Sequence, residues 1–160
     1  SWKDCRSKRC RLISDVACVI LSGGKSSRMG KDKALLPFGG FDTLTQFQVD
    51  KLKKEFAEVY ISCKSRDKFN FEANFIEDDS SFEDSAPFIG ILSALKELEH
   101  EWIFVLSVDA PFFEISHIRS LYTLIDDDTS AIVSRSSDGN QPLCAMYKKD
   151  TVEIFENLIK

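Results

Sequence analysis

The chain has 160 residues, 43% of them hydrophobic, and a formal net charge of −5 at pH 7. This size and composition predict one globular domain rather than a disordered or fibrous protein. The net negative charge argues against broad binding to nucleic acid or to an anionic membrane, because both need an extended positive surface. No apolar run reaches the roughly 20 residues of a transmembrane helix, so we expect a cytoplasmic protein without membrane contacts.

The first 15 residues predict a basic arm in front of the domain. They contain five lysines and arginines and no apolar periodicity. Such a segment is typical of a solvated tail. We therefore expect a basic N-terminal arm over residues 1–15 and a single domain over residues 16–160.

The five cysteines do not predict a metal centre. They form no C-x-x-C pair, and the chain has only two histidines that could join them. Cys18 and Cys63 fall within predicted strands, where we interpret them as small buried hydrophobic residues.

Hydrophobic patterns predict strands and helices that alternate along the chain. The predicted strands cover residues 16–21, 59–63, 75–76, 102–108, 130–134 and 142–147. The predicted helices cover residues 43–56, 86–100 and 116–124, and a last helix starts at Thr151. Ser116 is the predicted N-cap of the third helix. This alternation predicts an α/β fold, a Rossmann-like three-layer α/β/α arrangement around a mostly parallel sheet.

Two of the predicted strands end in residues suited to ligand binding. A glycine-rich loop follows Leu21, and Asp109 follows the strand at residues 102–108. Ligands of open α/β sheets bind beyond the carboxyl ends of the strands. We therefore expect the loop and Asp109 to share one hollow that holds an anionic ligand and its divalent ion.

The loop after Leu21 fits neither of two well-known phosphate-binding motifs. A P-loop needs a glycine where Val19 stands, and the glycines of the loop do not have the G-x-G-x-x-G spacing of dinucleotide sites. Glycines nevertheless let backbone N–H groups approach phosphate oxygens. Four cations surround them and would suit a triphosphate: Lys25, Arg28, Lys31 and Lys33. The alternative is a tight glycine turn with a solvated cationic patch.

Five segments, in order along the chain, resemble the motifs of one enzyme family. The segment "LSGGKSSRMGKDKALL" (21–36) closely resembles the L-A-G-G-x-S-x-R-M-G-x-D-K signature of the MobA-like nucleotidyltransferases, the molybdenum cofactor guanylyltransferase group. The resemblance continues through four further segments: "FIEDD" (75–79), "PFIGILSAL" (87–95), "FVLSVDAPFF" (104–113) and "QPLCAMY" (141–147). It covers the chain from about Val16 to Leu158 and implies the family's nucleotidyltransferase fold.

The resemblance implies a role for each matching residue. Lys33, Arg28 and Asp109 would be catalytic, with Arg28 facing the departing pyrophosphate and Asp109 binding Mg²⁺. Ser62 stands where the family often has asparagine, a position that bears on recognition of the base. The nucleotide would be bound by Leu21, Ser22, Gly23, Gly24, Lys33, Ser62, Asp78 and Asp109, with the segment from Gly24 to Gly30 around its phosphates.

The function that the resemblance implies is transfer of GMP from Mg·GTP to molybdenum-bearing molybdopterin, which releases pyrophosphate. Such a reaction is catalysed mainly by electrostatics and needs no general base, because the acceptor phosphate is already ionised. Proteins that handle the molybdenum cofactor are the partners to expect. Two alternatives stay open: a related transferase that uses CTP or a sugar phosphate acceptor, and a catalytically silent nucleotide-binding module.

Several polar residues have simpler interpretations. Asp78 and Asp109 could be ordinary turn residues. The run of residues 126–128, three aspartates in a row, predicts a solvated turn, since consecutive side chains cannot all converge on one ion. We expect His100 and His117 at the surface.

The end of the chain carries two further expectations. Gln141 is a candidate contact for the acceptor pterin. Members of the family finish with an N-x-N-T-P-like segment, so we expect that this chain, which stops at Lys160, lacks the C-terminal segment.

Overall fold

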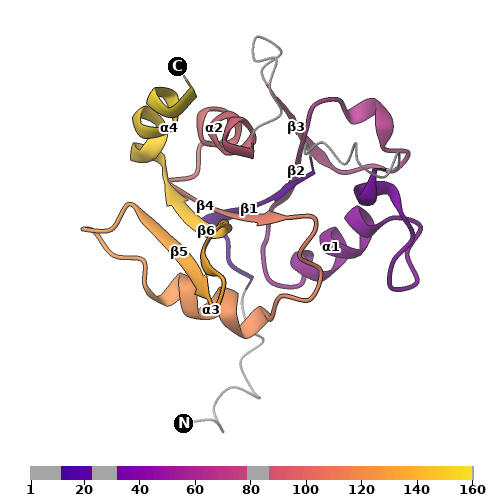
Figure 1. The fold of residues 1–160 in the computed structure, drawn as a ribbon, viewed down its shortest axis with the longest axis horizontal. Helices are drawn as coiled ribbons and strands as arrows, with labels where there is room; N and C mark the ends of the chain where they lie inside the picture. The colour runs from indigo at the N-terminus through magenta and orange to yellow at the C-terminus, as the bar shows by residue number, and fades with distance from the viewer. Residues whose placement is uncertain (1–11, 23–31, 79–86, 160) are drawn as a thin grey trace, which may run out of the picture.

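One sheet of six strands organises the computed structural model, which describes residues 12–22, 32–78 and 87–159 (Figure 1). The strand order is β3-β2-β1-β4-β6-β5. The strands are β1 (Val16–Leu21), β2 (Val59–Cys63), β3 (Asn74–Glu77), β4 (Trp102–Ser107), β5 (Ala131–Ser136) and β6 (Gly139–Lys148). The helices are α1 (Leu44–Lys53), α2 (Pro87–Glu97), α3 (Ile115–Thr123) and α4 (Val152–Ile159), and short 3₁₀ turns cover Lys33–Leu35, Arg66–Lys68 and Lys149–Thr151.

The strand directions confirm the predicted, mostly parallel sheet. β1 pairs in parallel with both β2 and β4, and β2 pairs in parallel with β3. Only β6 runs against this direction, because it is antiparallel to both β4 and β5 in the part of the chain that the structure describes. From β1 the chain crosses over to β2 and β3 on one side. It then returns to β4, which lies on the other side of β1.

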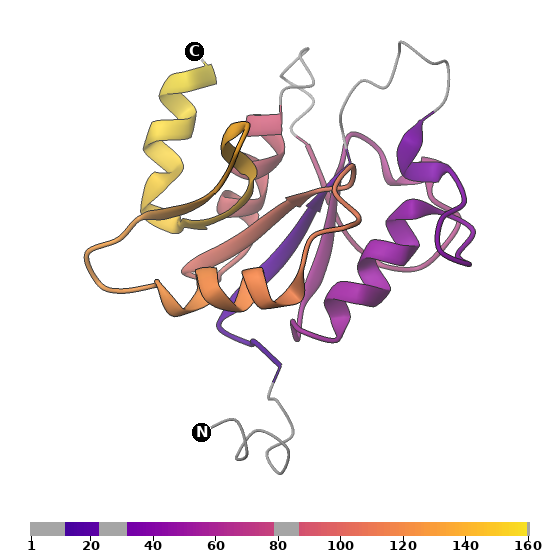
Figure 2. The same ribbon diagram turned by 60° about the horizontal axis from the view of Figure 1, so that its bottom comes forward.

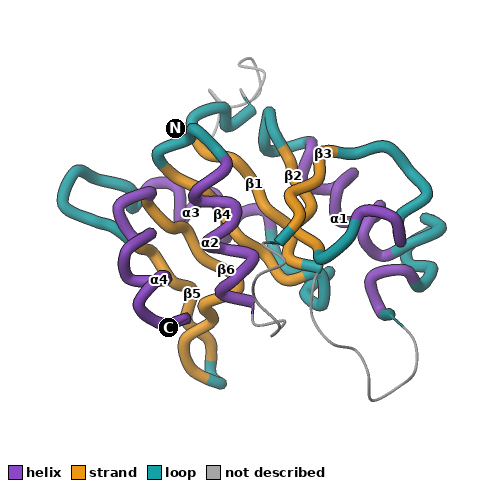
Figure 3. Tube along the Cα trace, turned by 90° about the horizontal axis from the view of Figure 1, so that it is seen from above, coloured by secondary structure: helices purple, strands orange, loops and turns teal. Residues whose placement is uncertain are grey.

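Helices cover both faces of the sheet, which makes the three predicted layers. Figures 1 and 2 show α1 and α3 on one face and α2 and α4 on the other. In β1, Cys18 and Ile20 join the core beneath α1 and α3, whereas Val19 and Leu21 join the core beneath α2 and α4. This double burial is why β1 and β4 are nearly continuous apolar runs in the sequence. Figure 3 shows the same layers from above.

The start of α3 differs from the prediction. The helix begins at Ile115, so Ser116 lies in its first turn and is not the N-cap. Glu114 occupies the cap position without a capping side-chain bond, and the Ser116 hydroxyl donates a hydrogen bond to Glu114 Oε2 instead. The prediction of a Ser116 cap was therefore wrong. The other strand and helix boundaries lie within a few residues of the predicted ones.

The packed domain extends ahead of β1 to Ile13. This side chain is 3% exposed, its N–H donates to the Glu55 carbonyl at 2.8 Å, and its carbonyl accepts from the Ala57 N–H at 2.9 Å. Ile13 thus belongs to the core rather than to a solvated tail. Residues 1–11 of the predicted arm lie outside the described residues.

Cys18 and Cys63 are fully buried, as predicted. Burial raises the pKa of Cys18 well above its ordinary value and raises the pKa of Cys63 to about 11. Both thiols are therefore protonated at neutral pH and serve as packing groups.

Aspartates 126–128 lie in an exposed turn between α3 and β5, where Asp126 Oδ1 accepts hydrogen bonds from the Asp128 N–H and the Thr129 hydroxyl. The predicted solvated turn is confirmed. His117 is exposed as predicted, but His100 is not: its ring is mostly buried and pairs with the Glu58 carboxylate. None of the helices in the described segments is long and apolar enough to span a bilayer.

Candidate active site

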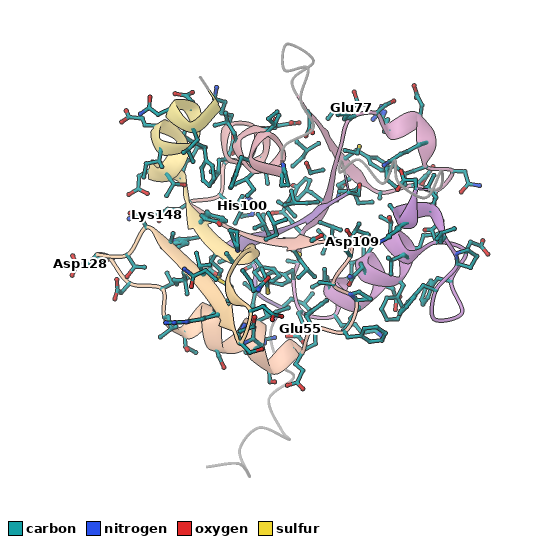
Figure 4. All side chains as sticks on the ribbon, in the orientation of Figure 1. Glu55, Glu77, His100, Asp109, Asp128 and Lys148 are labelled. Carbon is teal, nitrogen blue, oxygen red and sulfur yellow. The ribbon has the colours of Figure 1, made fainter. Side chains whose placement is uncertain are left out.

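The carboxyl ends of β1 and β4 meet at the centre of the sheet. Leu21, the last residue of β1, is paired with Ser107, the last residue of β4, and the Val108 N–H donates to the Leu21 carbonyl at 3.0 Å. The chain crosses over in opposite directions on either side of β1, and open α/β sheets bind ligands at such a switch point. Figure 4 shows Asp109 just beyond the end of β4. The end of β1 and Asp109 therefore lie at the same edge of the sheet.

Ser22 anchors the end of β1 to β2. Its N–H and its hydroxyl both donate to the Ser62 carbonyl, at 2.9 and 3.0 Å, and the residue is 2% exposed. Its carbonyl accepts a hydrogen bond from Lys68 Nζ at 3.0 Å. Ser22 thus fixes the point at which the chain leaves the sheet toward residues 23–31.

Ser62 and Asp78 form a pair at the ends of β2 and β3. The Ser62 hydroxyl, itself buried, donates to Asp78 Oδ1 at 3.2 Å, and the Asp78 N–H donates to the Cys63 carbonyl at 2.8 Å. Burial raises the pKa of the Asp78 carboxyl above its ordinary value of 3.8, while the Ser62 hydrogen bond and the positive charge of Lys64 oppose that shift. The pair places a half-buried carboxylate beside the end of β1.

Helix α2 approaches this pair at Gly90. A Cβ atom on Gly90 would lie 2.7 Å from Ser62 Oγ, 3.1 Å from Leu21 Cδ2 and 3.6 Å from Asp78 Oδ1. Side chains do not tolerate the first of these distances, so the absence of a Cβ is what lets α2 pack against the ends of β1 and β2. Gly90 thereby joins three of the predicted nucleotide-binding residues in one packed cluster.

Lys33 opens a 3₁₀ turn that is anchored from two sides. Asp32 caps the turn, because its Oδ1 accepts from the Ala34 N–H at 3.0 Å. Ala34 is buried, and its carbonyl accepts from the Thr45 hydroxyl of α1 at 2.8 Å. Lys33 itself is exposed. A fixed backbone with an exposed ammonium group is suited to binding an anion that arrives from solvent.

Asp109 is carried by a turn that α1 holds in place. Lys51 Nζ donates to the carbonyls of Pro111 and Phe113, at 3.1 and 2.9 Å, and lies 4.1 Å from the centre of the Phe113 ring. Gln48, fully buried, directs its amide nitrogen at the Val108 carbonyl at 3.4 Å. Side chains of α1 therefore form hydrogen bonds with the backbone on both sides of Asp109.

The Asp109 carboxylate is exposed, whereas its backbone N–H donates to Ser107 Oγ at 3.3 Å. Among the described residues, no group of three or more His, Cys, Asp and Glu side chains is arranged to hold a metal ion. Mg²⁺ often takes only one or two carboxylates and completes its octahedron with water and substrate phosphates. One exposed carboxylate at the sheet edge fits an ion that is shared with a nucleotide.

Three of the predicted site residues cannot be placed. Gly23, Gly24 and Arg28 lie outside the described residues. Gln141 is described and lies near the start of β6, which runs antiparallel to β4 and so begins where β4 ends. Its amide nitrogen donates to Ser136 Oγ at 3.1 Å.

Comparison with known proteins identifies the family. The family model described as the MobA-like NTP transferase domain matches residues 18–160. The chain belongs to the MobA-like NTP transferase family. A molybdenum cofactor guanylyltransferase of Campylobacter jejuni is 36% identical to this MobA-like chain over 148 residues, 92% of this chain and 76% of the relative. One of Helicobacter pylori is 28% identical over 154 residues, 93% of this chain and 74% of the relative.

A solved structure agrees with the fold of this MobA-like chain. The molybdopterin-guanine dinucleotide biosynthesis protein A of Archaeoglobus fulgidus matches it with a TM-score of 0.74 at 23% identity, over 90% of this chain and 73% of that one. The predicted family, nucleotidyltransferase fold and enzyme class are thereby confirmed.

Four residues at this MobA-like sheet edge were missed in the sequence: Gln48, Lys51, Lys68 and Gly90. A glycine inside an otherwise apolar helix pattern signals close backbone packing, so Gly90 could have been found. The other three carry no local signal, because their hydrogen-bond partners lie 36 to 62 residues away.

Proposed function

We propose that this protein transfers GMP from GTP to the molybdopterin form of the molybdenum cofactor, with Mg²⁺, and releases pyrophosphate. The observation that carries the proposal is the junction of the β1 end with the Asp109 turn, at the switch point of a sheet in the MobA-like family. Relatives named molybdenum cofactor guanylyltransferase, among them one that is 36% identical, support the choice of substrates.

The proposed reaction is an in-line displacement. An oxygen of the acceptor phosphate forms a bond to the α-phosphorus of GTP, and the bond from that phosphorus to the pyrophosphate oxygen breaks. The acceptor phosphate is ionised near neutral pH, so no side chain has to remove a proton. Of the two histidines, His100 lies near the start of β4, at the opposite end from Asp109 (Figure 4), and the His117 ring is hydrogen-bonded to Ser134 Oγ at 2.8 Å.

Charge stabilisation is the main task of the protein in this reaction. We assign Lys33 to the triphosphate, because its ammonium group is exposed on an anchored turn. Leu21 and Ser22 at the end of β1, with Gly23, Gly24 and Arg28 beyond it, would line the same phosphates. Ser62 and Asp78 would contact the nucleoside, one strand further along the sheet edge.

Asp109 would hold Mg²⁺ together with water and phosphate oxygens. The ion, when bound, supplies charge neutralisation and fixes the geometry of the phosphates. The chain contributes the Asp109 carboxylate. Hydrogen bonds from Lys51 and Gln48 hold the backbone on both sides of Asp109.

The proposed reaction is tested by supplying the protein with GTP, Mg²⁺ and molybdenum-bearing molybdopterin and measuring pyrophosphate release. We expect turnover with GTP and none when the acceptor is omitted. Calorimetry should show tighter binding of GTP than of CTP. Nucleotide binding without pyrophosphate release would instead identify a silent binding module.

A cytidylyltransferase is the second candidate, and Ser62 is the observation that favours it. Family members often have asparagine at this position, and Ser62 lies buried beside Asp78 and Gly90. A serine presents one hydroxyl where an asparagine presents both a donor and an acceptor. Tighter binding of CTP than of GTP, or pyrophosphate release with CTP but not with GTP, would establish this candidate and overturn the guanylyl assignment.

The proposed reaction also suggests a setting. We place the protein in the cytoplasm, where GTP is available, and assign it proteins that deliver or receive the molybdenum cofactor as partners.

A further inference from the structure

Lys68 lies at the sheet edge and contacts both ends of the segment expected to bind the phosphates. Its Nζ donates to the Ser22 carbonyl at 3.0 Å and to Asp32 Oδ2 at 2.8 Å. Ser22 and Asp32 flank residues 23–31, the heart of the glycine-rich motif. One side chain therefore spans the two points between which that motif is held.

The three groups are shielded enough for their contacts to matter. The Lys68 and Asp32 side chains are 27% and 32% exposed, and the Ser22 residue is 2% exposed. A hydrogen-bonded ion pair with this degree of burial is less screened by solvent than a pair on the open surface. Lys33 is exposed, whereas the Lys68 ammonium group is directed toward Ser22 and Asp32.

Lys68 is itself held in place by local structure. It ends the 3₁₀ turn Arg66–Lys68, whose N-cap Ser65 accepts from the Asp67 N–H at 3.3 Å. The next residue, Phe69, is buried, and its ring centre lies 5.0 Å from Lys68 Nζ. The Arg66 N–H donates to Glu77 Oε1 of β3 at 3.1 Å. The turn is thereby tied to the edge of the sheet, and the ammonium group starts from a fixed base.

Asp32 transmits this contact to Lys33. One of its carboxylate oxygens binds Lys68, and the other accepts the Ala34 N–H and so caps the turn that begins at Lys33. The position of the turn relative to the end of β1 thus depends on a chain of contacts from Ser22 through Lys68 and Asp32 to Ala34.

We propose that Lys68 is a positioning residue, a clasp that sets the distance between the end of β1 and the turn of Lys33 so that both can meet one triphosphate. This inference rests on the proposed nucleotide-binding function, which it deepens. Lys68 acts through Asp32 and Ser22 and does not itself contact the phosphates.

Two substitutions test the clasp. Lys68→Met keeps the apolar stem but removes the donor. Asp32→Asn keeps an oxygen that can cap Ala34, since asparagine is as good an N-cap as aspartate, but removes the charge that pairs with Lys68. Lys54→Met is the matched control, because it also removes one lysine but from an exposed pair with Asp50 at the end of α1.

Amide hydrogen exchange of the nucleotide-free protein decides whether the clasp exists. We expect the Ala34 N–H to exchange about tenfold faster in Lys68→Met and in Asp32→Asn, because opening of the turn becomes easier when a charge-assisted hydrogen bond is lost. Exchange in Lys54→Met should equal that of the wild type. Unchanged exchange in Lys68→Met would overturn the clasp.

Calorimetric GTP binding decides whether the clasp serves the site. We expect both variants to bind GTP about five- to thirtyfold more weakly, and the double variant to bind no more weakly than Lys68→Met alone, because both substitutions break one contact. A lysine that touched the phosphates directly would give the opposite result for Asp32→Asn, which would bind GTP more tightly after loss of a nearby negative charge. Tighter binding by Asp32→Asn, or wild-type binding by Lys68→Met, would refute the inference.

Failure of the proposed function has a different signature. If the wild-type protein binds no nucleotide, the proposed function is refuted. The proposed role of the clasp in nucleotide binding is then refuted as well. The exchange measurement, made without nucleotide, would still decide whether Lys68 holds the turn of Lys33.

Discussion

A methyl group on Gly90 of α2 would lie 2.7 Å from the hydroxyl oxygen of Ser62 at the end of β2. Replacement of a helical glycine by alanine normally stabilises a protein by about 1 kcal/mol. Here the clash costs about 1–3 kcal/mol, as other small-to-large changes in packed sites do. We therefore expect Gly90→Ala to leave the protein no more stable than wild type, or less stable by up to about 2 kcal/mol, in urea unfolding.

The partner residue supplies the control for Gly90→Ala. In a Ser62→Ala background the hydroxyl is absent. The clash cost of Gly90→Ala should therefore be mostly absent in that background. Equal effects of Gly90→Ala in both backgrounds would show that the contact with Ser62 is not what requires glycine.

Asp109→Asn separates a metal ligand from an ordinary turn residue. Asparagine suits turns as well as aspartate does, so a mere turn residue would tolerate the change. Loss of the negative charge at a Mg²⁺ ligand should instead lower kcat by about a hundredfold or more, the size of effect seen when a group that stabilises transition-state charge is removed. Pyrophosphate release, measured as Mg²⁺ is titrated, checks this.

The outcome for Asp109→Asn should also show in the metal dependence. We expect the variant to need more Mg²⁺ for half-maximal rate, while its thermal stability stays near that of the wild type. Near-normal turnover at ordinary Mg²⁺ would return Asp109 to the role of a turn residue.

Lys51→Met tests whether α1 positions the Asp109 turn. Methionine keeps an apolar stem against Phe113 but cannot donate to the carbonyls of Pro111 and Phe113. We expect a loss of about 1–3 kcal/mol in the free energy of unfolding, because two hydrogen bonds from a charged group are removed. We also expect a lower kcat and a raised Mg²⁺ requirement. Lys53→Met, an exposed neighbour on the same helix, is the matched control and should change neither.

The edge of the sheet that carries the candidate site could be predicted, because the strands that meet there are visible in the hydrophobic periodicity. The apolar run of β1 and the run that ends before Asp109 both indicate buried parallel strands, and parallel strands bring their carboxyl ends together. The resemblance added expected roles to these positions, and three of them, Leu21, Ser62 and Asp78, pack around Gly90.

The supporting contacts could not be predicted, because they depend on distances in the folded chain. In the sequence Lys51 and Lys68 look like any surface lysine. In the structure the ammonium group of each donates hydrogen bonds to backbone carbonyls far away along the chain. His100 was misplaced for the same reason, since its partner Glu58 is brought near only by the fold. The Ser116 cap was wrong by a short-range error: the cap position is Glu114, two residues earlier, so the Ser116 hydroxyl lies inside the first turn of the helix.

Asp78 gives the protein a pH dependence of defined sign. Burial raises the pKa of its carboxyl above the ordinary 3.8, so the folded state holds the proton at pH values where the unfolded chain has already released it. Stability then falls as the pH rises through the window between 3.8 and the pKa of the folded state, and the cost persists at pH 7. Asp78→Asn, which still offers an oxygen to the Ser62 hydroxyl, removes this cost. We expect the variant to be more stable than wild type at pH 7, with the difference disappearing below pH 3.8 in denaturant unfolding.

Asp126 is the matched control, because the shift there has the opposite sign. Hydrogen bonds from the Thr129 hydroxyl and the Asp128 N–H lower the pKa of this exposed carboxyl. Its ionised form therefore favours the folded state, so Asp126→Asn should make the protein slightly less stable at pH 7, and that difference too should vanish in acid. A gain in stability from Asp78→Asn that is equal at pH 3 and pH 7 would show that the burial of its charge is not the cause.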